Sequence, residues 1–312
     1  MRVAAVDCGT NSLRLLVADV DGHAKVDVHR EMRVVRLGQD VDRTGELAPE
    51  ALERTRLALS DYAGVCRELG VERTRMVATS ATRDARNRED FHAMVLAVLG
   101  APPEVVSGDE EAALSFDGAT RGLDPDDGPF LVMDIGGGST ELVLGTVADG
   151  RGAVAAARSV DVGCVRLTER HLLADPPGTE QVAGAMADID AALALVREVV
   201  PVEQARTAVG LAGSVTTVAA LALDLPAYDA DRIHLSRLSA DQIRTVADRL
   251  LAMTRQERAA LPVMHPGRVD VIGAGALILA VLVGRLGLPE VLVSEADILD
   301  GIAWSIPGAS AS

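Results

Sequence analysis

Lysine and aromatic side chains are nearly absent from this sequence of 312 residues. Of its 30 basic residues a single one, Lys25, is a lysine, and it stands outside any G-x-x-x-x-G-K pattern. A Walker-type phosphate loop needs its lysine against the β- and γ-phosphates, so that chemistry is excluded. Aromatic residues make up 2% of the chain, which leaves few platforms on which single-stranded nucleic acid could stack.

Cysteine is scarce, and long apolar runs are missing. The cysteines are Cys8, Cys66 and Cys164. Because no C-x-x-C pair occurs, the sequence predicts neither a disulfide framework nor a zinc site. The start, MRVAAVDCGT, lacks the apolar, cleavable pattern of a secretory signal. The most apolar tract, VIGAGALILAVLVG, is shorter than the ~20 residues that span a bilayer. We therefore expect a buried helix there and a cytoplasmic protein without membrane contact.

The charge balance is strongly acidic, with a formal net charge of −16. Such a chain repels nucleic acid and anionic membranes, so neither is an expected partner. Any polyanion would have to be met by a local basic site. The chain is 48% apolar and longer than a single core usually allows, which predicts two domains of about 100 to 200 residues each.

One strand–turn–strand pattern occurs twice. The stretch AAVDCGTNSLRLLVADV near the N-terminus aligns without a gap with LVMDIGGGSTELVLG, which begins at residue 131. The aligned pairs are Asp7 with Asp134, Gly9 with Gly136, Ser12 with Ser139, and Leu15 with Leu142. Each copy is an apolar strand, a D-x-G turn and a second apolar strand. A repeat this far apart is not a solenoid period and indicates one duplicated domain.

The remaining pattern predicts an α/β protein of two similar domains with a cleft between them. We expect further strands at 24–31 and 32–38, a helix from Pro49 to a stop at Gly70, and a helix that Asn87 opens. The second half repeats this order. The segment GATRGLDPDDGPF marks the boundary, because turn residues cluster there. The expected domains are 1–122 and 123–295, and the closing helix at 296–306 is a candidate to complete the first.

The two glycine-rich turns are predicted phosphate-binding loops. Successive backbone N–H groups in such turns form a concave anion site, and glycine allows a phosphate to approach closely. The residues concerned are Gly9, Thr10, Asn11, Ser12, Gly136, Gly137, Gly138, Ser139 and Thr140. Asp7 and Asp134 would repel a phosphate bound at these turns unless a cation lay between the carboxylates and the phosphate. They therefore indicate a bound hard cation, and Mg²⁺ is typical of such sites. The alternative is that each aspartate caps its own turn.

The segment SGDEEA contains two adjacent glutamates, Glu110 and Glu111, for which the sequence predicts different roles. Ser107 and Glu110 have the spacing of a capping box, in which Glu110 reaches back to the helix start. Glu111 is rotated from it by about 100° around the helix and can point elsewhere.

Four motifs, VAAVDCGTNSLRLLVADV, ATSATRDARN, SGDEEAALSFDGA and LVMDIGGGSTELVLG, together resemble the Ppx/GppA family of exopolyphosphatases and guanosine pentaphosphate phosphohydrolases. GLAGSVTTVAAL and RVDVIGAGALIL resemble later segments of that family, so the likeness extends from about Val3 to Ile302. The resemblance implies the actin-like fold of sugar kinases and heat-shock ATPases, built from two RNase H-like domains. It also implies a short form without the C-terminal HD-type extension of some members, and hence weaker binding of very long chains.

The resemblance assigns roles to single residues. Glu111 matches the family's general base, and Arg83 matches its phosphate-contacting arginine. Glu141 matches an acid after the glycine loop that holds metal or water, so Asp134, Asp7 and Glu141 form the expected Mg²⁺ site, with Mn²⁺ as a substitute.

Several neighbouring residues are left outside the expected site or open. Arg14 can face substrate or solvent, and Arg86 is more readily a charged surface residue than a phosphate ligand. Asn87 is expected to cap the helix that follows it. Arg268 and Asp270 are expected to form a structural ion pair.

The function implied is Mg²⁺-dependent release of terminal phosphate from inorganic polyphosphate. Guanosine pentaphosphate is the alternative substrate, although no motif for guanine is evident. An ATP-dependent small-molecule kinase and a non-catalytic polyphosphate or nucleotide sensor are the other classes considered; a sensor would be expected to lack Glu111 or Asp134. A homodimer is compatible with the sequence.

Overall fold

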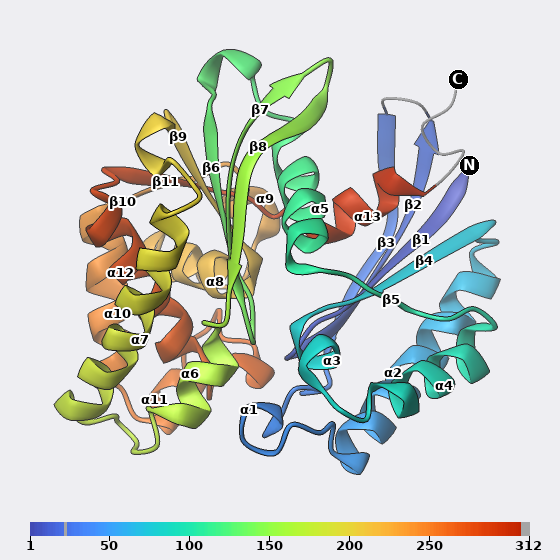
Figure 1. Ribbon diagram of the computed structural model, residues 1–312, viewed down its shortest axis with the longest axis horizontal. Helices are drawn as coiled ribbons and strands as arrows, with labels where there is room; N and C mark the ends of the chain where they lie inside the picture. The colour runs from blue at the N-terminus through green and yellow to red at the C-terminus, as the bar shows by residue number, and fades with distance from the viewer. Residues whose placement is uncertain (22–23, 307–312) are drawn as a thin grey trace. The chain divides into compact units, whose positions relative to one another are not determined.

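The computed structural model describes residues 1–21 and 24–306, and the chain divides into two compact units. Unit 1 comprises Met1–Gly118 and Ile298–Ser312, and unit 2 comprises Ala119–Asp297. Each unit is an α/β domain with its own mixed sheet (Figure 1). In the described part of the chain, no helix combines the length and the apolar character needed to cross a membrane.

Unit 1 is built on a five-stranded sheet with the order β3-β2-β1-β4-β5. Its strands are β1 (Arg2–Cys8), β2 (Ser12–Asp21), β3 (Ala24–Val34), β4 (Arg73–Ala78) and β5 (Glu104–Val105). The first three strands form an antiparallel meander, and β4 and β5 run parallel to β1. Its helices are α1 (Val41–Thr44), α2 (Pro49–Glu68), α3 (Ser80–Asp84), α4 (Arg88–Leu99), α5 (Gly108–Thr120) and α13 (Ile298–Ser305).

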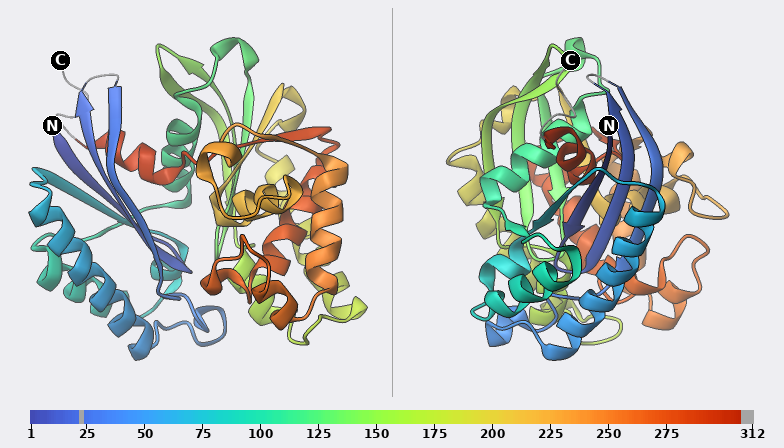
Figure 2. Two further views of the ribbon diagram at one scale, coloured as in Figure 1. Left: turned by 180° about the vertical axis from the view of Figure 1, so that it is seen from behind. Right: turned by 90° about the vertical axis from the view of Figure 1, so that its right-hand side faces the viewer.

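Both faces of the unit 1 sheet are covered. On one face, alternate residues of β1 and β2 pack with side chains of α2 and α4, among them Tyr62 and Phe91. On the other face, Val3, Ala5 and Leu16 pack against α13. Figure 2 shows this helix in red beside the blue strands of the sheet. A Cβ atom at Gly301 of α13 would collide with the Leu114 carbonyl of α5, so glycine permits this close helix contact. The last helix of the chain therefore completes the core of the first unit.

Unit 2 is built on a six-stranded sheet with the order β10-β11-β9-β6-β7-β8. Its strands are β6 (Phe130–Ile135), β7 (Thr140–Ala148), β8 (Arg151–Val160), β9 (Thr207–Leu211), β10 (Arg237–Ser239) and β11 (Glu290–Val293). Its helices are α6 (Cys164–Arg170), α7 (Thr179–Arg197), α8 (Ala212–Ala222), α9 (Ala230–Ile233), α10 (Ala240–Ala252), α11 (Arg255–Ala259) and α12 (Ile272–Leu286). Short 3₁₀ turns add Pro125–Asp127, Val202–Gln204 and Pro266–Arg268. The apolar tract predicted as a buried helix forms α12, whose residues are buried along most of its length.

The two sheets share one topology, which confirms the predicted duplication. Strands β8-β7-β6-β9-β11 of unit 2 repeat the order β3-β2-β1-β4-β5 of unit 1, and β10 is an addition at one edge. In both units the first three strands are antiparallel and the next are parallel to the first. This is the RNase H-like arrangement expected for an actin-like domain.

Sequence patterns predicted the ends of helix α2 correctly, but one strand was wrongly divided into two. Helix α2 begins at Pro49, and Gly70 after it has a φ of +67°, a left-handed conformation that ends helices. The two strands expected at 24–31 and 32–38 are wrong, because a single strand, β3, runs from Ala24 to Val34. No glycine or proline lies in that stretch to break it.

Candidate active site

The two D-x-G turns have the same backbone geometry. In unit 1 the amide of Gly9 donates to the carbonyl oxygen of Ser12 at 3.0 Å, and in unit 2 the amide of Gly136 donates to that of Ser139 at the same distance. The alignment made from sequence thus pairs residues with equivalent hydrogen bonds.

A carbonyl group of each turn accepts a hydrogen bond from a backbone amide of another segment, which anchors the turn. In unit 1 the Thr10 carbonyl accepts from the Gly38 amide at 2.8 Å. In unit 2 the Gly137 carbonyl accepts from the Val165 amide at 2.8 Å. A Cβ atom at Gly163 would collide with that Gly137 carbonyl, so a glycine is needed where the chain crosses behind the turn.

The amide groups of the turns are available on the other side. Among the residues that the structure describes, the amides of Thr10, Asn11, Gly137 and Gly138 donate to no protein acceptor. Thr10 and Gly138 are buried and Asn11 and Gly137 are partly exposed, and successive amides in such a turn can donate to an external acceptor such as a phosphate oxygen. Ser139 and Thr140 are buried beside the second turn, and the Thr140 hydroxyl donates to Val162 at 2.6 Å, which anchors that turn.

Asp7 and Arg14 form an ion pair at the base of the first turn. They face each other across β1 and β2, and Arg14 Nε and Nη2 donate to Asp7 Oδ2 at 2.9 and 2.7 Å. The Asp7 carboxylate is almost fully buried. Arg14, whose role was open, therefore supplies a positive charge next to this aspartate.

Asp134 and Glu141 occupy the equivalent positions of unit 2. They face each other across β6 and β7, and both are buried. Directly opposed residues of an antiparallel pair project from the same face of the sheet, so these two carboxylates are neighbours. Ser159 of β8 donates its hydroxyl to Glu141 Oε1 at 2.7 Å, which orients that carboxylate.

Glu111 is fixed by Arg83. Glu111 lies in the first turn of α5 and is 7% exposed. Arg83, at the end of α3, donates through Nη1 to Glu111 Oε2 and to the Val106 carbonyl, each at 3.0 Å. The carboxylate is thereby held in one orientation with its negative charge offset.

Helix α3 connects this pair to the first turn. Its first residue, Ser80, shares a hydrogen bond of 2.9 Å with the Thr10 side chain, and three residues later Arg83 contacts Glu111. Unit 1 therefore brings together an amide turn, an arginine and a carboxylate, all of them residues selected from the sequence.

Of two residues next to the site, Asn87 differs from the expectation and Arg86 agrees with it. Asn87 makes no capping bond; its side chain pairs with the backbone of Leu47 through bonds of 2.8 and 3.0 Å and so ties down a distant loop. Arg86 lies on the surface and pairs with Glu46 at 3.2 Å.

Arg268 does not form the expected pair with Asp270. Asp270 instead binds Arg255 at 2.6 Å. The Arg268 guanidinium lies over Gly213 at the start of α8 and donates to the Thr217 hydroxyl at 3.1 Å. Helix α8 begins at Ala212, so this arginine lies beside the first turn of a helix, where anions bind readily, although the sequence analysis left it outside the site.

The thiols near the turns are not reactive groups. Burial raises the pKa of Cys8, well above its usual range, and also raises the pKa of Cys164. A raised pKa favours the protonated thiol, which is a poor nucleophile. Among the described residues, no group of three or more His, Cys, Asp or Glu side chains is placed to hold a metal.

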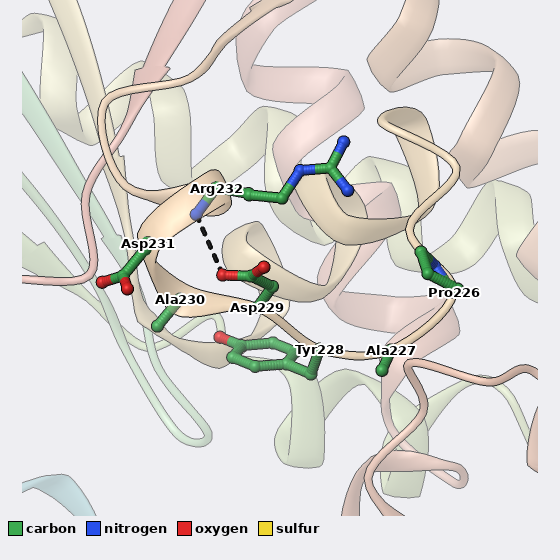
Figure 3. Close-up of a pocket in the computed structure, with 7 residues that line it drawn as sticks. All are labelled: Pro226, Ala227, Tyr228, Asp229, Ala230, Asp231 and Arg232. Carbon is green, nitrogen blue, oxygen red and sulfur yellow. Dashed lines mark hydrogen bonds between the residues drawn. The ribbon is translucent and has the colours of Figure 1, made fainter.

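A hollow in unit 2 lies apart from the predicted residues. It is lined by residues 226–232, and its polar groups serve the local fold (Figure 3). Asp229 Oδ1 accepts from the Arg232 amide at 3.2 Å and caps α9. The Tyr228 hydroxyl is bonded to Thr216 and Glu295 at 2.7 and 2.6 Å.

Comparison with known proteins agrees with this arrangement. Exopolyphosphatase 2 of Mycobacterium tuberculosis is 53% identical over 320 aligned residues, which cover 98% of this chain and 99% of the relative. The crystal structure of an exopolyphosphatase-like protein matches with a TM-score of 0.92 at 43% identity, covering 98% of both chains. The Ppx/GppA enzyme of Aquifex aeolicus matches with a TM-score of 0.79 at 32% identity, covering 97% of this chain and 98% of that one.

The repeated sheet topology and the two equivalent D-x-G turns define a duplicated α/β protein. The model of the Ppx/GppA phosphatase family matches residues 16–306, and the chain belongs to this family.

Proposed function

We propose that this chain is an exopolyphosphatase that releases terminal orthophosphate from inorganic polyphosphate. The observation that carries the proposal is the grouping in unit 1, where α3 links the amide turn at Thr10 to the pair of Arg83 and Glu111. Turn amides and an arginine suit phosphate oxygens, and a fixed carboxylate suits a water molecule. The relative that shares 53% of its residues is named an exopolyphosphatase.

Glu111 is the proposed general base. Its carboxylate takes a proton from a water molecule, and the water oxygen attacks the terminal phosphorus in line with the bridging oxygen. The bond between that phosphorus and the bridging oxygen breaks, so the products are orthophosphate and a polyphosphate one unit shorter. The turn amides and Arg83 stabilise the negative charge on the phosphoryl oxygens and on the leaving chain.

The proposed metal is Mg²⁺, with Mn²⁺ as a substitute, and the residues of unit 2 fit it. Asp134 and Glu141 are buried carboxylates that project from one face of the sheet, and their oxygens are the ligand type that a hard cation prefers. Mg²⁺ is commonly held by one or two carboxylates, with waters and substrate phosphates completing its shell. When bound, it would offset phosphate charge. Asp7 already has Arg14 as its cation, so it is the weaker metal candidate.

Polyphosphate is the preferred substrate over guanosine pentaphosphate. Every group assigned here, whether amide, arginine or metal ligand, addresses phosphate, and a repeating anion needs only such contacts. A local site of this kind also suits a polyanion that the net charge of −16 would otherwise repel. We also propose a cytoplasmic location, because the three cysteines are free, as in a reducing compartment.

Phosphate release tests the proposal directly. Short polyphosphate, long polyphosphate and guanosine pentaphosphate are compared at equal phosphate concentration with Mg²⁺ present. We expect the highest kcat/KM with polyphosphate. A higher value with guanosine pentaphosphate would make the nucleotide the substrate, and release of phosphate from none of the three would refute a hydrolytic function on this class of compound.

A further inference from the structure

Arg75 of β4 contacts three other elements of unit 1 at once. Its Nη2 donates to Glu110 Oε1 of α5 at 2.8 Å. Nε and Nη2 donate to Glu104 Oε2 of β5 at 3.0 and 2.6 Å, and Nη1 donates to the Ser305 hydroxyl of α13 at 2.6 Å. With 15% of its side chain exposed, Arg75 is largely enclosed by these partners.

These contacts act on a short connection. Only Val106 and Ser107 separate β5 from α5, and α5 starts with Gly108, which gives the helix start little stiffness of its own. Arg75 binds one glutamate before this link and one after it, so its guanidinium bridges β5 and the first turn of α5.

The two adjacent glutamates of α5 are bound by two different arginines. Arg83 binds Glu111, and Arg75 binds Glu110. As consecutive residues of a helix, the two glutamates point in directions about 100° apart around the helix axis. The Ser107 hydroxyl accepts from the Glu110 amide at 3.2 Å, so the serine half of the predicted capping box is present. Among the described residues, the Glu110 carboxylate binds Arg75 and not the Ser107 amide, so the reciprocal half is missing.

Helix rotation would move both glutamates together. If Glu110 leaves Arg75, the first turn of α5 can rotate or shift, and the Glu111 carboxylate moves with it. A displacement of about 1 Å at a reacting group can cost ~10²-fold in rate. The ion pairs themselves involve carboxylates that are about half exposed, and such pairs contribute little to stability.

We propose that Arg75 is a positioning residue that fixes the direction of the Glu111 carboxylate by binding Glu110 and Glu104. The proposal rests on the function proposed above, since it assumes that Glu111 is the base. Arg75 itself does not touch substrate in this scheme. Its effect reaches the reaction only through the start of α5.

The test places Arg75→Gln in the wild-type chain and in the Glu111→Gln variant. In the wild-type chain we expect kcat to fall about tenfold with little change in KM, since orientation and not binding is lost. Arg75→Lys keeps a charge that can reach one carboxylate and should restore part of kcat. In the Glu111→Gln variant, Arg75→Gln should change the residual rate less than about twofold, because there is no carboxylate left to orient.

Arg2→Gln is the matched control. Arg2 also belongs to unit 1 and binds Asp19 through two bonds of 2.9 and 2.8 Å, but it does not contact α5. Its loss should leave kcat unchanged. An equal kcat for Arg75→Gln and Arg2→Gln, or the same fall from Arg75→Gln in both backgrounds, overturns the positioning role while leaving Glu111 as base. Full activity of Glu111→Gln overturns both proposals.

Discussion

Asp134 lies directly opposite Glu141 across two antiparallel strands, in the register that Asp7 and Arg14 occupy in the other unit. The duplicated position therefore holds a cation and an anion in unit 1 and two anions in unit 2. The same position of the repeat thus opposes a carboxylate to a guanidinium in one unit and to a second carboxylate in the other.

Asp134→Asn should weaken Mg²⁺ binding. We expect the Mg²⁺ concentration for half-maximal activity to rise about tenfold or more, within the range that altered metal surroundings usually cause. The rise in Tm that Mg²⁺ produces in the wild type should also be lost, since a bound ligand stabilises the folded state. Without metal, Tm should not fall, because one of two opposed negative charges is gone. Thermal unfolding with and without Mg²⁺ measures this.

Asp126→Asn is the control for that change, since Asp126 is an exposed acid of the same unit. It should keep the wild-type response to Mg²⁺. If Asp134→Asn also keeps that response, the aspartate serves the turn and the metal lies elsewhere.

Arg14→Gln should destabilise the protein by about 3 kcal/mol, because it leaves the buried Asp7 carboxylate without its counter-charge. The double variant Asp7→Asn and Arg14→Gln should recover much of that loss. Urea unfolding of the two single variants and the double variant measures the coupling. Strictly additive effects would contradict the importance of this pair.

Glu111→Gln should lower kcat by ~10² to 10⁴, the usual effect of losing a general base. Substrate binding should persist or tighten, because a negative charge near a polyanion is removed. Glu110→Gln should stay mostly active, since glutamine keeps an oxygen for Arg75 and is tolerated in a capping box. Rates under substrate saturation decide between the two residues; an inactive Glu110 variant beside an active Glu111 variant would exchange their roles.

Gly163→Ala should displace the second turn, because the added methyl group collides with the Gly137 carbonyl. We expect KM for polyphosphate to rise and stability to fall by about 1 to 3 kcal/mol, the range typical of overpacking. Gly122→Ala places its methyl group in open space and should alter neither property. Wild-type kinetics for Gly163→Ala would show that the turn is not part of the binding site.

Local sequence patterns predicted two similar α/β domains, and the family resemblance supplied the actin-like fold. The gapless alignment of Asp7 with Asp134 located both hairpins and the duplication, because a D-x-G turn between apolar strands is a pattern read within a few residues. Pro49 and Gly70 marked a helix correctly for the same reason. The division of 24–38 into two strands was wrong since nothing in those residues indicates where one edge strand ends.

The partners of individual side chains could not be predicted in the same way. Arg14 is seven residues from Asp7 and meets it only because the hairpin register opposes them. Asn87 has the composition of a helix cap, yet its amide binds Leu47, 40 residues earlier. Such contacts depend on packing of distant segments, which no local pattern encodes. The family resemblance supplied the role of Glu111, and the structure added the arginines that surround it.

The position of α13 also affects how the protein can be made. Unit 2 is one continuous segment, and a ribosome delivers all of it before residue 298. Until α13 emerges, the sheet face that carries Val3, Ala5 and Leu16 has no cover from that helix. A nascent chain with such an apolar face exposed is prone to aggregate. A chain released from the ribosome before α13 is synthesised would keep that face exposed. The last helix thus sets the moment during synthesis at which the first domain can become stable.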